Sequence, residues 1–251
     1  MKKLVSFTIK ADFGMFKKPD INDKIFITYN IIPKPYILGI LGAIAGYGGH
    51  AQNSDKADMP EYYKKFRDMK IAISPTDKNG GIYKKEFILF NNTCNGDTKN
   101  ITEQTLINPA YDIYLEIDCS VYAHKKLYAR LKTNKAVYLP YMGKNEFTLS
   151  WDDFYEHTIF SKVDAKTQFQ VLTIIPKNQN FILKNSGYKE RTTNYFYLFE
   201  RLPIDWQDNP RQYKYCDFLY TNAVFKTTDT FNKTDSFCEL HECDKGVICL
   251  F

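Results

Sequence analysis

The residues of this chain best suited to bind a metal ion lie close to its C-terminal end. Cys238, His241, Cys243 and Cys249 carry the thiol and imidazole ligands that zinc prefers. Their spacings are not those of a paired C-x-x-C site, and Cys249 falls in a stretch typical of a terminal strand. We therefore expect no metal and no cofactor here, and reduced thiols at the six cysteines.

A second set of residues combines cations with aromatic rings in one turn near the start of the chain. Lys10, Lys17 and Lys18 flank Phe13 and Phe16 there. Single-stranded nucleic acid is bound by cations that meet its phosphates and by flat faces on which its bases stack. The alternative is that the rings plug the core and that the lysines are ordinary surface residues.

Glycine recurs in the apolar stretch "KPYILGILGAIAGYGG", whose first dozen residues, 34–45, predict a helix with a core stripe at helical spacing. Gly39, Gly42 and Gly46 lie on a neighbouring stripe, although each costs up to about 1 kcal/mol relative to Ala inside a helix. A missing side chain lets another backbone or a phosphate come close. The residues alone favour neither partner, and the stretch lacks the G-x-x-x-x-G-K-[ST] of a phosphate-binding loop.

Charge is distributed unevenly over the 251 residues. The net charge is +5, but residues 1–150 hold 22 basic against 15 acidic side chains, a net of +7, whereas residues 151–251 hold 12 against 14. A basic half rich in aromatic rings suits a nucleic-acid partner, and a near-neutral half suits packing or protein contacts.

The sequence has no apolar segment long enough to span a membrane. Its longest apolar run is about a dozen residues, well short of the roughly 20 that span a bilayer. The start, "MKKLVSFTIKAD", is basic but lacks the continuous apolar middle of a secretion signal. We expect a cytoplasmic protein without a membrane partner.

The elements that must position these residues follow from hydrophobic periodicity. Val5, Phe7 and Ile9 alternate with polar residues and predict a half-buried strand. Up to residue 143 we expect strands at 4–10, 70–74, 82–90, 110–118 and 136–143, and helices at 34–45, 60–69 and 122–132. The polar stretch 91–100 indicates a long hairpin or an inserted loop. The order is that of a βαββαβ ferredoxin-like fold, shared by RNA-recognition domains.

Beyond Trp151 the helical periodicity fades. Short runs typical of strands, at 169–175, 180–184, 195–202, 214–225 and 245–251, are separated by Asn, Pro, Asp and Gly. We therefore expect an α+β protein with a ferredoxin-like domain at 1–148 and a smaller β-rich domain at 149–251.

Four segments resemble one known family. "FTIKADFGMFKKPDIN", "YNIIPKPYILGILGAIAGYGG", "YLPYMGKNEF" and the final "VICLF" are similar, in this order, to the CRISPR-associated family called Cas five, of the RAMP superfamily, and most closely to its type I-B members. The resemblance implies a non-catalytic subunit of the Cascade complex that caps and kinks the 5′ handle of the guide crRNA. It also implies contacts with the large subunit and the first backbone subunit, and with target DNA through the complex.

In that family a β-hairpin thumb is inserted in the ferredoxin-like domain, and 80–108 is the matching stretch here. The residues that we expect to contact RNA are cations, aromatic rings, small residues and one amide. They are Lys10, Phe13, Phe16, Lys17, Lys18, Lys34, Gly39, Gly42, Gly46, Lys84, Lys85, Tyr141, Gly143, Lys144 and Asn145.

Two alternatives stay open. Type I-C relatives cut the guide precursor without a metal, using a tyrosine, a histidine and a lysine; Tyr47, His124 and Lys125 supply these types. A histidine can shuttle a proton and a lysine can stabilise the phosphorane while a 2′-hydroxyl attacks. The glycine helix and the "MGKNE" loop favour the type I-B branch, so we expect no catalysis. The third possibility is a structural adaptor that meets only acidic proteins.

Overall fold

A four-stranded antiparallel sheet forms the centre of the protein. The computed structural model describes residues 2–19, 25–53, 58–77, 79–94, 97–163, 168–177, 181–183, 195–207, 212–227 and 237–251. The sheet contains β1 (Lys2–Lys10), β4 (Ile71–Pro75), β7 (Ala110–Asp118) and β8 (Ser150–Glu156) in the order β4-β7-β1-β8. This is the strand order of a ferredoxin-like fold, which confirms the expected class.

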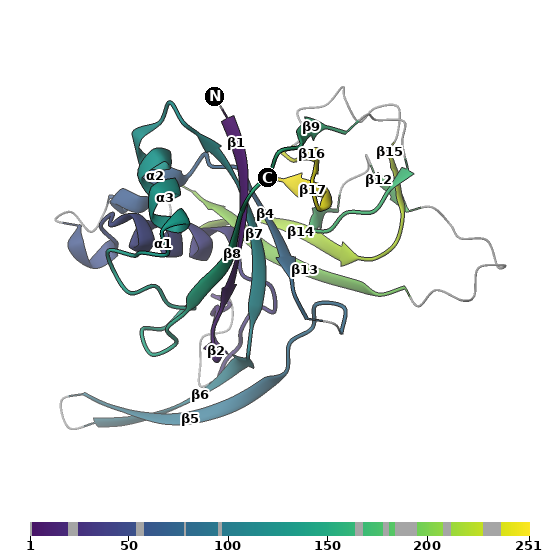
Figure 1. The fold of residues 1–251 in the computed structure, drawn as a ribbon. Coiled ribbons are helices and arrows are strands. Elements are labelled where there is room, and N and C mark those ends of the chain that lie inside the picture. The colour runs from purple at the N-terminus through teal and green to yellow at the C-terminus, as the bar shows by residue number, and fades with distance from the viewer. Residues whose placement is uncertain are drawn as a thin grey trace.

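Helices cover one side of this sheet, and the C-terminal strands lie on the other (Figure 1). The helices are α1 (Lys34–Ala45), α2 (Glu61–Phe66) and α3 (Tyr122–Lys132), with a short 3-10 turn, η1, at His50–Gln52. Val5, Phe7 and Ile9 join the core that contains the helices. Leu4 faces the opposite way and packs with Ile248 of the last strand. Because both faces of β1 are covered, Ser6 is buried as well.

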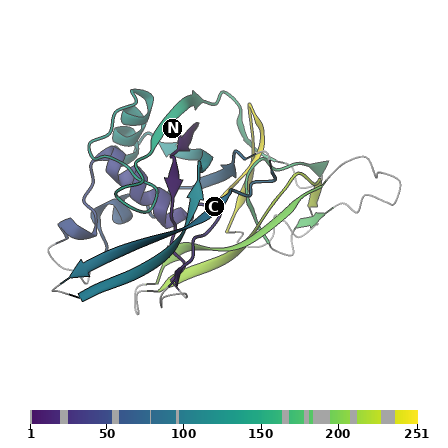
Figure 2. The same cartoon turned by 90° about the horizontal axis from the view of Figure 1, so that it is seen from below.

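The insertion expected between the second and third strands of the sheet is a long hairpin. It consists of β5 (Lys85–Cys94) and β6 (Asp97–Ile107), which pair antiparallel along their length. The short strands β2 (Phe13–Gly14) and β3 (Ile25–Phe26) also pair with β6. Figure 1 shows the hairpin projecting from one end of the sheet, and Figure 2 shows that it runs toward the side on which the helices lie. We call β5 and β6 the thumb.

The closing strand was predicted at the wrong place. Residues 136–143 form a loop with one isolated bridge, at Tyr141, and the fourth strand is β8, beyond the expected boundary at 148. The N–H groups of Val137 and Tyr138 donate hydrogen bonds of 3.2 and 3.0 Å to the carbonyls of Ile44 and Ala43. The loop therefore satisfies carbonyl groups at the end of α1, which would otherwise lack partners.

The C-terminal strands form three small antiparallel sheets. Their orders are β10-β15-β12, β11-β14-β13 and β17-β16-β9. The strands are β9 (Phe160–Lys162), β10 (Gln168–Phe169), β11 (Ile175–Pro176), β12 (Phe181–Leu183), β13 (Tyr197–Trp206), β14 (Tyr213–Thr221), β15 (Phe225–Thr227), β16 (Glu239–Cys243) and β17 (Gly246–Leu250). No helix in the described part of the chain is long and apolar enough to cross a membrane.

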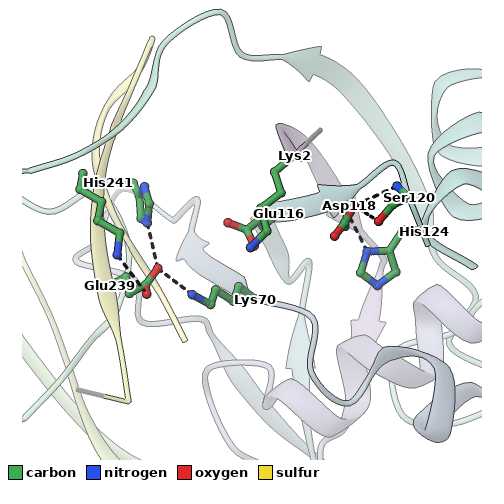
Figure 3. A network of polar contacts seen from close by, with 9 residues as sticks. Lys2, Lys70, Glu116, Asp118, Ser120, His124, Glu239 and His241 are labelled. Atoms are coloured by element: carbon green, nitrogen blue, oxygen red, sulfur yellow. Dashed lines mark hydrogen bonds and ion pairs between the residues drawn. The ribbon is translucent and has the colours of Figure 1, made fainter. Parts of the chain in front are cut away.

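One carboxylate joins the C-terminal strands to the segment that leads into β4. Glu239 of β16 lies 2.6 Å from Lys70 Nζ, 3.2 Å from His241 Nε2 and 3.4 Å from Lys162 Nζ (Figure 3). His241, weighed as a metal ligand from the sequence and set aside, is engaged by a carboxylate. Cys243 and Cys249 are buried core residues. Among the described residues, no group of three or more His, Cys, Asp or Glu is arranged to hold a metal.

Candidate nucleic-acid interface

The glycines of α1 make room for this chain's own side chains. A Cβ atom at Gly42 would lie 2.3 Å from Cβ of Tyr62. Gly46 ends the helix in the left-handed region, at φ +79°, and its N–H donates to the carbonyl of Gly42. The expectation that these two glycines leave bare backbone for RNA is therefore corrected: one admits a tyrosine, and the other caps a helix. Gly39 differs, because the nearest atom to its Cβ position is 3.9 Å away.

Gly39 lies in the wall of an open cleft of about 700 Å³ between α1, the 138–145 loop, the η1 turn and the ends of β13 and β14. Aromatic rings make up much of the lining. The lining residues are Pro35, Tyr36, Gly39, Ile40, Ala43, Tyr47, Gly49, His50, Ala51, Gln52, Tyr62, Tyr138, Leu139, Tyr141, Gly143, Asn145, Trp206 and Tyr213. We call this hollow the aromatic cleft.

Packing holds the deeper rings of the aromatic cleft in place. Trp206 and Tyr213, facing each other across the β13–β14 pair, have ring centroids 4.1 Å apart. The backbone N–H of Trp206 donates to the hydroxyl of Tyr63 at 2.9 Å, and that hydroxyl donates in turn to Asp205. Burial raises the pKa of Tyr36 and Tyr62 to about 12. Their hydroxyls therefore stay neutral at physiological pH.

The loop around Gly143 belongs to both the aromatic cleft and the thumb. Tyr141, Gly143 and Asn145 line the cleft. Gly143 has φ +87°, and a Cβ there would overlap the carbonyl oxygen of Met15 at 1.8 Å, so only glycine fits. Lys144 points to the thumb, where its Nζ lies 2.8 Å from Oε1 of the buried Glu103. The loop predicted from "YMGKNEF" thus connects the two features.

The basic turn near the start of the chain lies against the thumb and β13. Nζ of Lys17 is 3.6 Å from the ring centroid of Phe26, and Nζ of Lys18 is 3.8 Å from Glu200 Oε1. Phe13 is 41% exposed and its ring centroid lies 5.7 Å from that of Phe147. Phe16 is fully buried. The stacking role expected for Phe16 is therefore wrong, because its ring fills the core.

The other predicted lysines have different surroundings. Lys10 pairs with Asp152 of β8, and Lys84 pairs with Glu86 on the thumb. Burial lowers the pKa of Lys85, which lies near Glu200. Lys10 therefore lies on the central sheet, whereas Lys84 and Lys85 lie at the start of the thumb.

Lys34 was expected at the RNA surface, and the structure corrects this. Its side chain is buried, and its Nζ donates to the backbone oxygen of Phe251 at 3.0 Å. Burial lowers its pKa to about 8. Lys34 therefore connects the start of α1 to the residue that follows the last strand, β17.

Tyr47 and His124 both pack on the ring of Phe66, whose centroid lies 5.6 Å from that of Tyr47 and 6.1 Å from that of His124. Nδ1 of His124 accepts the N–H of Asp118 at 3.1 Å (Figure 3), and burial lowers the pKa of this imidazole. Lys125 is exposed on α3. Nζ of Lys126 lies 4.6 Å from the ring centroid of Tyr47, so the neighbouring lysine faces the tyrosine.

Sequence reasoning missed most rings of the aromatic cleft. Tyr36, Tyr62, Tyr138, Trp206 and Tyr213 come from separate parts of the chain, and no local pattern connects them. The apolar run from Val137 to Leu139 looks like a strand by composition, and only the structure shows that these residues are exposed on a loop.

Comparisons with known proteins agree with this architecture. No protein-family profile and no curated protein matches the sequence. The fold is that of a CRISPR protein from Archaeoglobus fulgidus, with a TM-score of 0.53, 11% identity, and coverage of 99% of each chain. A chain of a CRISPR RNA-guided surveillance complex aligns with a TM-score of 0.47 at 9% identity, over 90% of this chain and 96% of that one. The sheet order and the β5–β6 hairpin define the class as a ferredoxin-like α+β protein with an inserted hairpin.

Proposed function

We propose that this protein is a non-catalytic RNA-binding subunit of a type I-B CRISPR Cascade complex. In this role it caps and kinks the 5′ handle of the guide crRNA and contacts the backbone and large subunits. The observation that carries the proposal is the loop at 141–145, which gives side chains to the aromatic cleft and to the base of the thumb. An RNA strand that runs along this loop would contact the projecting thumb and then the stacking surfaces of the aromatic cleft. This arrangement suits a single-stranded RNA held in a bent shape.

The likeness in fold supports the proposal, because 99% of the chain aligns with a CRISPR protein. The β5–β6 hairpin matches the thumb that the resemblance to the Cas five family implies. The net charge of +7 in residues 1–150 supports an anionic partner for this half. The four segments that resemble the Cas five family support the type I-B assignment.

The surroundings of His124 support a non-catalytic role. Self-cleavage of RNA needs a base, an acid and a cation around one phosphate. The imidazole of His124 packs on the ring of Phe66, and its Nδ1 already accepts the N–H of Asp118.

RNA binding is tested by gel shift with a single-stranded RNA that carries the repeat-derived handle, at several salt concentrations. Lys17→Ala combined with Lys18→Ala weakens binding and lowers the salt slope by about 1.4, because each phosphate contact to a single strand contributes about 0.7. The matched control is Lys162→Ala with Lys245→Ala, which removes the same charge from the C-terminal strands. Equal affinities for the two double variants would exclude this turn from the RNA path. If the unmodified protein binds no RNA, the result would favour the structural adaptor that meets only acidic proteins.

Catalysis is tested separately by incubating the protein with a repeat hairpin RNA in EDTA. We expect the RNA to keep its length. A shortened product that is lost in His124→Ala would contradict the non-catalytic role.

A further inference from the structure

The aromatic cleft has no lysine, arginine, aspartate or glutamate in its lining, and His50 is its one titratable residue besides the tyrosines. Phosphate groups would find no lysine or arginine inside it, and a cationic ligand would find no carboxylate. A flat, uncharged ring system with polar edges fits this chemistry best, because it stacks on tyrosine and tryptophan without losing a charge interaction.

The outer rings of the aromatic cleft are open to solvent. Tyr138 is 50% exposed, Leu139 68% and Tyr141 42%. The 138–145 loop thus presents apolar surface beside a wall of packed rings, Trp206 and Tyr213. A cleft of about 700 Å³ falls within the range of about 300–1,000 Å³ typical of small-ligand sites, so a nucleoside has room.

Polar groups in the lining can meet the edge of a base. Asn145 is exposed and has an amide with both donors and an acceptor. Oε1 of Gln52 accepts the N–H of Gly49 at 2.9 Å, which leaves its amide N–H groups for other partners. Such groups give orientation to a ring that stacking alone would hold loosely.

Cations lie just outside this interior. The ring centroid of Tyr36 lies 5.3 Å from that of Phe16, the residue before Lys17, so the basic turn adjoins the cleft wall. Lys126 lies against the ring of Tyr47, another lining residue. Phosphates can therefore stay at the rim while the base between them turns inward.

We propose that the aromatic cleft holds a nucleobase that has been turned out of the bound single-stranded RNA. This inference rests on the proposed RNA-binding function and assigns to the cleft a ligand class, an unpaired base. Because the lining holds no lysine, arginine or carboxylate, we expect the contribution of the cleft to affinity to be independent of salt. The lysines outside it supply the salt-dependent part.

The test uses handle RNAs with 2-aminopurine at successive positions, since the fluorescence of this base reports stacking. We expect one position to be strongly quenched on binding. Tyr138→Ala with Tyr141→Ala removes two exposed rings, restores the fluorescence and weakens binding by about five-fold to a hundred-fold, with an unchanged salt slope. The matched Phe variants keep the rings and bind normally. The control is Tyr197→Ala, a 49% exposed tyrosine at the opposite end of β13 from Trp206.

An abasic nucleotide at the quenched position gives the decisive comparison. It weakens binding to the unmodified protein by as much as the tyrosine variants do, and has no further effect on those variants. Two results would overturn the base site and leave the RNA-binding function standing. The first is normal RNA binding without a quenched position, and the second is full affinity after loss of both tyrosines. If the unmodified protein binds no RNA, the proposed function itself fails.

Discussion

Lys144 Nζ lies 2.8 Å from Oε1 of Glu103, and this ion pair joins the 141–145 loop to strand β6 of the thumb. The side chain of Glu103 is 3% exposed, and that of Lys144 is 24% exposed. Phe90 of β5 adds to the junction, with its ring centroid 4.4 Å from Nζ of Lys144. A lysine expected to meet RNA is therefore placed to set the direction of the thumb.

Lys144→Ala leaves a buried carboxylate without its cation. We expect the free energy of unfolding to fall by about 1–3 kcal/mol, measured by urea denaturation. Adding Glu103→Gln removes the unpaired charge and recovers part of that loss.

RNA affinity in the same variants separates two roles of Lys144. If it positions the thumb, the double variant binds RNA better than Lys144→Ala alone. If it contacts a phosphate directly, both variants bind equally weakly and the salt slope falls by about 0.7.

Gly39 and Gly42 lie one turn apart in α1 but should respond differently to alanine. At Gly42 the new methyl group would be 2.3 Å from Tyr62 and must displace α2, whereas at Gly39 it would lie 3.9 Å from the same ring. We expect Gly42→Ala to lower stability by about 1–3 kcal/mol. Gly39→Ala should raise it by up to about 1 kcal/mol, because alanine favours the helix. Equal melting temperatures for the two variants would contradict the packing role of Gly42.

The buried Lys34 makes stability rise in mildly alkaline solution. Burial lowers its pKa from 10.5 to about 8. Below pH 8 the folded and unfolded states both hold the proton, and the buried charge destabilises the fold. Between pH 8 and 10.5 the unfolded chain holds more protons, so the free energy of unfolding rises with pH.

Lys34→Met should therefore stabilise the protein at pH 7, by up to about 3 kcal/mol. The oxygen of Phe251 that Lys34 contacts keeps the N–H of Ile71 as a donor, at 3.1 Å. Unfolding measured from pH 7 to 10 should show a flatter profile for the variant. A profile as steep as that of the unmodified protein would show that another group titrates there.

Glu239 should govern part of the acid stability. Burial raises its pKa, but hydrogen bonds from Lys70 and His241 and the charges of nearby lysines outweigh burial and lower the pKa to about 2. The unfolded value is 4.5, so the stabilisation is complete above pH 4.5 and is lost as the pH falls toward 2.

Glu239→Gln should lower stability at pH 7 by about 1–3 kcal/mol and make the decline between pH 4.5 and 2 shallower. Glu242→Gln is the control, because Glu242 is exposed on the same strand. Equal acid profiles for the two variants would show that the network around Glu239 contributes little.

Local patterns predicted many of the elements. The helix expected at 34–45 is α1, the helix expected at 122–132 is α3, and the strand expected at 110–118 is β7. Their apolar residues repeat at the period of the element, so each element could be predicted without knowing its neighbours. The closing strand was misplaced because the loop at 136–143 looks like a strand by composition, whereas hydrogen bonds to α1 hold it elsewhere.

The amino-acid sequence by itself determined the order of strands and helices, the position of the thumb and the basic character of the first 150 residues. Only the tertiary structure decided which side chains meet. It placed Tyr62 over Gly42, buried Phe16 and Lys34, and gathered Tyr36, Tyr138 and Trp206 around one cleft. The physical reason is that periodicity is a property of neighbouring residues, whereas a binding surface depends on contacts between segments far apart in the chain.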